Sequence, residues 1–307
     1  MSALSGRNLA MYVGLCAVWG TTWLVIKIGL EDLPPLWFGG IRMALACALI
    51  APFAFTRNAR KGARASWRPI LWSGLLQIGV NYACVFVAEQ WIESGLAAVL
   101  FATFPIFIGL FAHFMLPDEP WTRRTALSAG LGLLGVAVIE APAVATLFSS
   151  QTRLRFAGTA LMLLASLVAA YANVFNKKHL PKVPPAWNVW LQTLAGSTLL
   201  LLLATVFERG APMRWTPSST GALVYLAVFG TALPFAGLFW LIHRVPMSVI
   251  GTIPVVDTVI AVALGNIVLG EGFSARILAG AALILVGVLL ASAPLRVRSP
   301  VSDSSKA

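Results

Sequence analysis

The sequence predicts an all-α polytopic membrane protein whose ten transmembrane helices form two inverted five-helix repeats. Three observations predict this fold class. The 307 residues are 59% apolar and only 11% charged, with a mean hydropathy of +0.85, and so few polar residues cannot cover a water-soluble globule. The chain also divides into ten apolar runs long enough to cross a bilayer. Matching residues recur, in the same order, about 150 positions apart.

Each helical span needs about 20 predominantly apolar residues to cross about 30 Å of hydrocarbon. Runs of this kind lie between breaks rich in Pro, Gly and charged residues. The predicted spans are residues 8–29, 36–55, 70–90, 95–116, 125–139, 158–176, 188–207, 221–242, 247–269 and 277–293. The first run is too long for the core of a signal peptide, so we expect it to be retained.

The net charge of +11 is distributed unevenly over the predicted connections. With both termini on the cytoplasmic side, 15 Lys and Arg residues lie on that side and five lie outside, namely Arg153, Arg155, Arg209, Arg214 and Arg276. Cationic connections tend to stay in the cytoplasm, so the asymmetry predicts this orientation. The basic excess therefore indicates topology and contact with anionic lipid, and it argues against a nucleic-acid partner.

The internal repeat is clearest where PPLW at 34–37 returns as PPAW at 184–187. Further matches at offsets of 149 to 152 pair Trp19 with Tyr171, Trp23 with Phe175, Trp91 with Trp240, Pro105 with Pro254, Glu119 with Glu271 and Gly135 with Gly287. We therefore predict a first repeat at 8–145, a second at 152–293 and a short cytoplasmic tail at 294–307.

An odd number of spans in each repeat makes the second repeat enter the bilayer from the opposite side. Inverted repeats of this kind suit alternating access to a site between them, so the duplication indicates a transporter. The fifth span of each repeat, 125–139 and 277–293, is rich in Gly and Ala and almost free of polar side chains. Small residues permit close helix packing in lipid, so we expect these spans to be scaffold and the pathway to lie among the other eight.

The chain resembles ten-span permeases of the drug/metabolite transporter superfamily, EamA type, over about residues 10 to 293. The resemblance rests on Trp19-Gly20, on Arg42, on ESGLAAVLFATFP at 93–105 and on acidic motifs around Glu119 and Glu271. It implies two five-span halves in a bacterial inner membrane and a role like that of amino-acid and metabolite exporters. The first acidic motif departs from the usual Gly-Glu, because it reads Pro117-Asp118-Glu119.

Charged side chains within hydrocarbon are costly and tend to mark function. Arg42, in the second span, can clamp a substrate carboxylate or phosphate through its planar guanidinium; alternatively it locks the first three spans through an ion pair or by capping carbonyls. Asp257 follows Pro254, a residue expected to loosen the ninth span by freeing a backbone carbonyl. Its carboxylate can bind a substrate ammonium or accept a proton, or it is satisfied by neighbouring Thr or Asn. Gln192 takes the place of Arg42 in the second repeat, so we expect the two halves of a cavity to differ in charge.

Two further ionisable groups lie near the predicted outer ends of spans. Glu89 is either a gate residue or an interfacial carboxylate paired with Lys27. Lys27 is expected to extend its ammonium to the outer surface.

Uncharged polar and aromatic residues complete the candidate substrate-binding set. Gln77 and Asn81 lie four residues apart on one helix face, where they either bond to neighbouring helices or line a cavity. Trp19 and Trp23 share a face of the first span, and Tyr171 and Asn173 occupy the related part of the sixth. These aromatic rings can enclose an apolar or cationic substrate or simply pack.

Taken together, a carboxylate and a guanidinium in one cavity suit a zwitterion such as an amino acid. The sequence therefore predicts a secondary transporter that exports amino acids or related small metabolites, acting as a monomer or homodimer without a cofactor. A lipid or lipid-headgroup flippase is the alternative, which a groove opening to the side would favour. An intramembrane enzyme is disfavoured, since the sequence has no G-x-S-x-G, H-E-x-x-H or C-x-x-C motif, and its three cysteines, Cys16, Cys47 and Cys84, fall in apolar spans.

Overall fold

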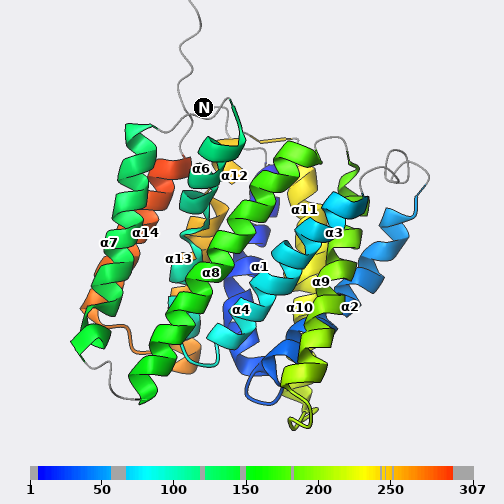
Figure 1. Ribbon diagram of the computed structural model, residues 1–307, viewed down its shortest axis with the longest axis horizontal. Coiled ribbons are helices and arrows are strands. Elements are labelled where there is room, and N and C mark those ends of the chain that lie inside the picture. Colours follow the sequence, from blue (N-terminus) through cyan, green and yellow to red (C-terminus); the bar gives the residue numbers. More distant parts are fainter. Residues whose placement is uncertain are drawn as a thin grey trace, which may run out of the picture.

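The computed structural model describes residues 6–56, 67–117, 122–145, 150–180, 183–242, 244–245, 247–250 and 252–292. Every regular element in these ranges is a helix (Figure 1). The first predicted repeat contains α1 (Gly6–Gly29), α2 (Pro35–Ala54), α3 (Trp67–Gly74), η2 (Leu75–Val80), α4 (Asn81–Ala88), α5 (Ser94–Phe101), α6 (Phe104–Met115) and α7 (Arg123–Ala145). The second contains α8 (Ser150–His179), α9 (Pro185–Phe207), α10 (Pro217–Ala227), η3 (Val228–Ala232), α11 (Leu233–Ile242), α12 (Met247–Ile250), α13 (Ile253–Leu269) and α14 (Ala275–Ser292).

The ten-helix membrane fold predicted from hydropathy is confirmed. Eight helical stretches in the described ranges are long and apolar enough to cross a membrane, and two shorter apolar helices, Ile253–Leu269 and Ala275–Ala291, complete the set. The predicted sixth span is longer than expected, because α8 runs from Ser150 to His179. Many large apolar side chains remain exposed, among them Phe53, Phe114 and Ile267, as expected for a surface in contact with lipid.

Four helical spans are interrupted, and the interruptions match between the two repeats. The third span changes to a π-helix at η2, and the eighth changes to a π-helix at η3. The fourth span breaks between α5 and α6, just before Pro105, and the ninth breaks between α12 and α13, just before Pro254. The continuous ninth span expected at 247–269 is therefore wrong, because Pro254 lies in the first turn of α13, where its missing N–H costs nothing.

The helix contacts obey a two-fold exchange of the repeats. α1 packs against α13, and its counterpart α8 packs against α6, the counterpart of α13. α1 also contacts the eighth span, while α8 contacts the third. α2 packs against its own counterpart α9, and α7 packs against α14, at opposite edges of the bundle in Figure 1. This exchange, with α1 and α8 running in opposite directions, is the inverted-repeat arrangement.

The scaffold character expected of the fifth spans agrees with how α7 and α14 pack. A Cβ added to Gly135 would lie 2.6 Å from the carbonyl oxygen of Gly280, and one added to Gly280 would lie 2.6 Å from that of Gly135. Ser128 Oγ also donates a hydrogen bond of 2.8 Å to the carbonyl of Gly287. The small residues thus bring the two backbones together where burial alone gives no hydrophobic gain.

One end of the bundle is tied together by carboxylates. We call it the Asp32 end, formed by the connections 30–34, 89–93, 208–216 and 270–274. Glu208 accepts hydrogen bonds from the first backbone N–H groups of α2, at Leu36 (2.8 Å) and Trp37 (2.9 Å). Glu271 does the same for α5, at Ser94 (2.7 Å) and Gly95 (3.0 Å). Each carboxylate accepts hydrogen bonds from backbone N–H groups that have no partner within their own helix. It also compensates the positive end of the dipole of that helix, which belongs to the other repeat.

Candidate functional site

A cavity of about 310 Å³ lies at the centre of the bundle, where both repeats meet. Its volume is at the lower end of the range for small-molecule sites. We call it the central cavity; it is lined by Trp19, Thr22, Trp23, Ile26, Arg42, Gln77, Asn81, Tyr82, Val85, Ala98, Phe101, Ala102, Phe104, Asn173, Gly230, Phe235, Pro254, Asp257 and Thr258. No described residue of α7 or α14 is among them, in keeping with a scaffold role.

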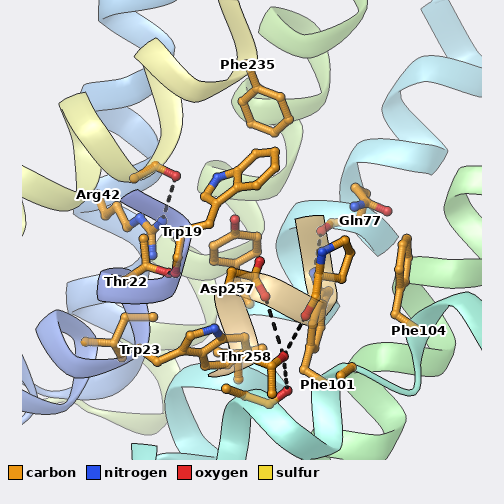
Figure 2. Close-up of a pocket in the computed structure, with 18 of the residues that line it drawn as sticks. Trp19, Thr22, Trp23, Arg42, Gln77, Phe101, Phe104, Phe235, Asp257 and Thr258 are labelled. Carbon is orange, nitrogen blue, oxygen red and sulfur yellow. Dashed lines mark hydrogen bonds between the residues drawn. The ribbon is translucent and has the colours of Figure 1, made fainter. Parts of the chain in front are cut away.

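Asp257 lies in the middle of the central cavity, with Trp19 on one side and Trp23 on the other (Figure 2). Close packing of α1 on α13 places it there, because a Cβ on Gly20 would lie 3.0 Å from the Asp257 carbonyl. The neighbouring Thr258 hydroxyl donates to the carbonyl of Pro254 at 2.7 Å and lies 3.4 Å from Asp257 Oδ1. One hydroxyl proton serves the shorter bond, so the carboxylate of Asp257 keeps its acceptor capacity for the cavity.

The guanidinium of Arg42 is held in the wall by the second repeat. Its Nε donates to Thr231 Oγ1 at 3.3 Å and its Nη2 to the Gly230 carbonyl at 3.4 Å. Both acceptors belong to η3, in which Thr231 Oγ1 donates to the Leu226 carbonyl five residues earlier at 3.0 Å. A Cβ on Gly230 would lie 3.0 Å from Nη2, so glycine leaves the guanidinium its space.

These contacts bear on both interpretations of Arg42 from the sequence, a substrate clamp and a structural lock. The ion pairs of the described residues join Arg155 to Glu93 and Glu140, so an internal ion pair of Arg42 is not seen there. Carbonyl contact is seen, at Gly230, but Nη1 is buried without a hydrogen-bond partner in the same part of the chain. Arg42 is therefore braced by η3 and retains one N–H donor group for another acceptor.

Gln77 lies across the cavity from Arg42 in Figure 2 and is joined to two further amides, Asn81 and Asn173. Asn173 Nδ2 of α8 donates to Gln77 Oε1 of η2 at 2.9 Å, and Asn81 Nδ2 donates to the Gln77 carbonyl at 3.0 Å. Asn81 Oδ1 is buried without a donor among the described residues. Both readings of Gln77 and Asn81 thus hold, since these residues line the cavity and Gln77 also bonds to a neighbouring helix.

Several lining residues escaped sequence reasoning. The walls are completed by Thr22, Tyr82, Phe101, Phe104 and Phe235. The aromatic rings of the last four make much of the cavity wall aromatic. Phe101 and Phe104 flank the break between α5 and α6. The available signal was Pro105, because an interrupted span in a repeat protein points to the binding site. The rings of the eighth span carried no such signal in the sequence.

Glu89 and Lys27 require correction. Glu89 is fully buried, with 0% exposure, at the end of α4, and it does not line the central cavity as the predicted substrate-binding residues should. Lys27 does not extend to the surface, because its Nζ donates to the backbone carbonyls of Glu89 at 2.5 Å and Ile92 at 2.7 Å. Those carbonyls follow the last turn of α4, where a cation compensates the unsatisfied acceptors.

Tyr171 and Gln192 also lie outside the central cavity. Tyr171 packs edge-on against Phe111 of α6, with ring centroids 5.4 Å apart. Gln192 is buried, and its amide donates to Asn188 Oδ1 at 2.8 Å and Asn176 Oδ1 at 3.4 Å. Although Gln192 matches Arg42 in the repeat, it ties α9 to α8 and contributes nothing to the cavity wall. The structure thus brings together six of the eight predicted site residues, Trp19, Arg42, Gln77, Asn81, Asn173 and Asp257.

The fold and the central cavity, with its few polar and charged groups, define a membrane transporter of the inverted-repeat type. The EamA-like transporter family matches residues 7–141 and 156–293, so nearly the whole chain is covered and the protein belongs to this family. In Figure 1 the helices of the two matched segments interleave, with α2 beside α9 at one edge of the bundle and α7 beside α14 at the other.

Relatives in other organisms are also named as transporters. The chain is 26% identical to the uncharacterized transporter YoaV of Bacillus subtilis over 282 residues, covering 91% of this chain and 94% of YoaV. It is 29% identical to the uncharacterized inner membrane transporter YedA of Escherichia coli strain K12 over 278 residues, covering 88% and 84% of the two chains. A probable amino-acid metabolite efflux pump of Salmonella typhimurium is 26% identical over 294 residues, covering 92% and 93%.

A solved structure titled "Crystal structure of protein" superimposes with a TM-score of 0.64 at 19% sequence identity. The match covers 94% of this chain and 98% of that one. At this identity the likeness supports the fold alone.

Proposed function

We propose that this protein is a secondary transporter that moves small zwitterionic metabolites, amino acids foremost, by alternating access through the central cavity. One observation carries the proposal: the cavity wall contains a carboxylate from the second repeat, Asp257, and a guanidinium from the first, Arg42. A zwitterion offers an ammonium to the former and a carboxylate to the latter, so that both charges are compensated away from water.

The remaining lining residues support a substrate of modest size. The cavity of about 310 Å³ is enclosed by aromatic rings, which favour apolar and cationic groups. The acceptor oxygen of Asn81, which lacks a donor among the described residues, offers a hydrogen bond to the substrate ammonium.

Export is the proposed direction, supported by the efflux pump of Salmonella typhimurium to which the chain is similar. The proposed location is a bacterial cytoplasmic membrane, as for YedA, with both termini cytoplasmic because the basic residues gather on that side. The Asp32 end of the bundle then faces outward. The protein functions as a monomer or homodimer.

The test is transport by the purified protein in proteoliposomes. A panel of radiolabelled amino acids is measured for counterflow and for net flux, with and without a pH gradient. Saturable counterflow of at least one zwitterionic amino acid, competed by its unlabelled form, is expected. Flux equal to that of protein-free vesicles for every member of the panel would refute the proposed substrate class.

A lipid flippase is the second candidate, and a specific feature favours it. An apolar groove of about 260 Å³, which we call the lateral groove, is lined by Leu49, Ile50, Phe53, Ala186, Val189, Val228, Ala232, Leu233 and Phe235. Phe235 also lines the central cavity, so its ring borders both spaces. Exposed Leu49, Phe53 and Leu233 place its mouth on the lipid-facing surface.

The two candidates differ in a measurable way. A flippase moves a fluorescently labelled phospholipid between leaflets. Phe235→Ala removes the ring that borders both spaces and would accelerate that movement. An amino-acid transporter leaves the leaflet distribution of the labelled lipid unchanged and shows counterflow of the amino acid instead.

A further inference from the structure

Glu89 is a buried acid outside the central cavity. Its side chain is 0% exposed, and neither Oε1 nor Oε2 has a hydrogen-bond donor among the described residues. Glu89 follows the last residue of α4 as its C-terminal cap, at the negative end of the helix dipole. An ionised carboxylate without donors in such a place is strongly destabilised.

The charged groups around Glu89 are occupied elsewhere. Lys27 of α1 directs its ammonium to two backbone carbonyls, those of Glu89 and Ile92. Glu271, between α13 and α14, caps α5 through Ser94 and Gly95 and is itself an acid. On α8, Arg155 pairs with Glu93 at 3.3 Å and lies 4.0 Å from Glu140.

Arg42 of α2 also lies against α4. Its guanidinium lies over the rings of Tyr82 (5.2 Å) and Phe86 (5.8 Å) of α4. Tyr82, Phe86 and Glu89 follow one another at intervals of four and three residues, so they share one face of the helix end. Arg42 therefore lies on the face of Glu89, while its N–H donors with partners are committed to η3.

The residue that follows Glu89 in the sequence is exposed to solvent. Gln90 is exposed, whereas the Glu89 side chain, in the same connection of the Asp32 end, is 0% exposed. Opening of this end would expose the Glu89 carboxylate to water, and closing it would bury the group again. Burial of the ionised form is costly and burial of the neutral form is not, so proton uptake and closure favour each other.

We propose that Glu89 is a proton-binding site, separate from the substrate site, whose protonation permits the Asp32 end of the bundle to close. The proton comes from water at the open Asp32 end, forms an O–H bond on the Glu89 carboxyl and returns to water when the group is exposed again. This inference rests on the proposed alternating-access transport, to which it adds a route for coupling to a proton gradient. In this proposal the carboxylate of Asp257 binds the substrate, and the carboxylate of Glu89 binds the proton.

The test measures closure without any substrate. Spin labels are attached through Gln90→Cys at the end of α4 and Ile267→Cys near the end of α13, both exposed positions, in a protein with Cys16, Cys47 and Cys84 replaced by Ala. Double electron–electron resonance in lipid nanodiscs then compares about pH 5 with about pH 9. We expect the population with the longer distance to increase at least about threefold at the higher pH.

Glu89→Gln keeps the side chain neutral, so this variant is expected to show the short distance at both pH values. Glu93→Gln, which neutralises a neighbouring exposed carboxylate, is the matched control and should keep the pH response. A pH response that persists in Glu89→Gln, or one that is absent from the unsubstituted protein, would overturn the proposal. Amino-acid counterflow is measured separately, so failure of the substrate assignment leaves this result interpretable.

A second measurement addresses variants that fold poorly. Thermal unfolding at about pH 5 is compared for the unsubstituted protein, Glu89→Gln and Glu89→Met, the last an apolar side chain of similar length. Unchanged midpoints are expected, because the native group is neutral in the closed state. Lower midpoints in both variants would identify Glu89 as a permanently ionised partner of Arg42 or Lys27 and would contradict the proposal.

Discussion

The two repeats share a backbone plan and differ in the chemistry they place on it. Both third spans of the repeats contain a π-helix, at η2 and η3, and both fourth spans break before a proline. In the first repeat η2 presents the amide of Gln77 to the cavity, whereas in the second η3 holds Arg42 through Gly230 and Thr231. Of the two breaks, the one in the second repeat lies next to an acid, Asp257.

The difference teaches that a symmetric scaffold can hold an asymmetric site. A π-helix shifts one residue out of the regular hydrogen-bond ladder and is common at functional sites. Each repeat has a π-helix in its third span. The residues of that π-helix decide whether it bonds to another helix or supports a charged group. Four predictions can break or sharpen this contrast.

The largest effect is expected for Asp257→Asn, which removes the cavity carboxylate without changing its shape. A hydrogen bond to a charged group contributes about 1.5–3 kcal/mol, so kcat/KM for a transported zwitterion should fall about 10- to 100-fold. Initial rates in proteoliposomes measure it, with the exposed Glu31→Gln as the control. Rates within about twofold of the unsubstituted protein would exclude Asp257 from the substrate site.

Arg42→Gln should reduce kcat/KM about tenfold, because the amide cannot replace a charged donor to the substrate carboxylate. Arg42→Lys retains the charge but loses the planar group that bridges Gly230 and Thr231, so an intermediate rate is expected. If Arg42 serves folding alone, Arg42→Gln instead lowers the thermal midpoint and leaves the rate per folded molecule unchanged.

One glycine from each π-helix, Gly79 in η2 and Gly230 in η3, should respond differently to alanine. In Gly230→Ala the new Cβ lies 3.0 Å from Arg42 Nη2, so we expect a three- to fivefold loss of transport with little loss of stability. In Gly79→Ala the Cβ meets Leu199 Cδ2 at 2.6 Å, a packing contact with α9. That variant should lose about 1–3 kcal/mol of stability with little change in transport by the folded fraction. Equal responses on both readouts would remove the distinction between the two π-helices.

The smallest effect is expected for Asn173→Leu, which removes the hydrogen bond of 2.9 Å to Gln77 Oε1. A bond between neutral groups contributes about 0.5–1.5 kcal/mol, and cavity water can replace part of it. Transport should fall about two- to fivefold, with KM more affected than kcat. A loss as large as that of Asp257→Asn would show that this bridge carries more of the site than its chemistry suggests.

Periodic and compositional features were readable from the sequence. Apolar runs predicted ten spans because every backbone group in lipid must be satisfied within a helix. The recurrence of PPLW as PPAW marks the starts of α2 and α9, since Pro35 and Pro185 both begin helices, ahead of the predicted spans at 36–55 and 188–207. The scarcity of ions in lipid singled out Arg42 and Asp257, which do line the cavity.

Direction and environment of single side chains were not readable. Glu89 and Asp257 are both acids near the end or middle of a span, yet one is enclosed and the other faces the cavity. Tyr171 packs on Phe111 although its repeat partner Trp19 lines the cavity. A π-helix rotates the residues after it, so a regular helical period does not give the face of Glu89, which lies beyond η2.

The amino-acid sequence by itself determined that this protein lies in a membrane, crosses it about ten times and consists of two related halves. Those properties follow from the free energy of transferring each segment into lipid and from residues that recur at one offset. The tertiary structure alone decided which polar groups meet. The distance between Arg42 of one repeat and Thr231 of the other depends on how two inverted bundles pack, and no local pattern encodes it.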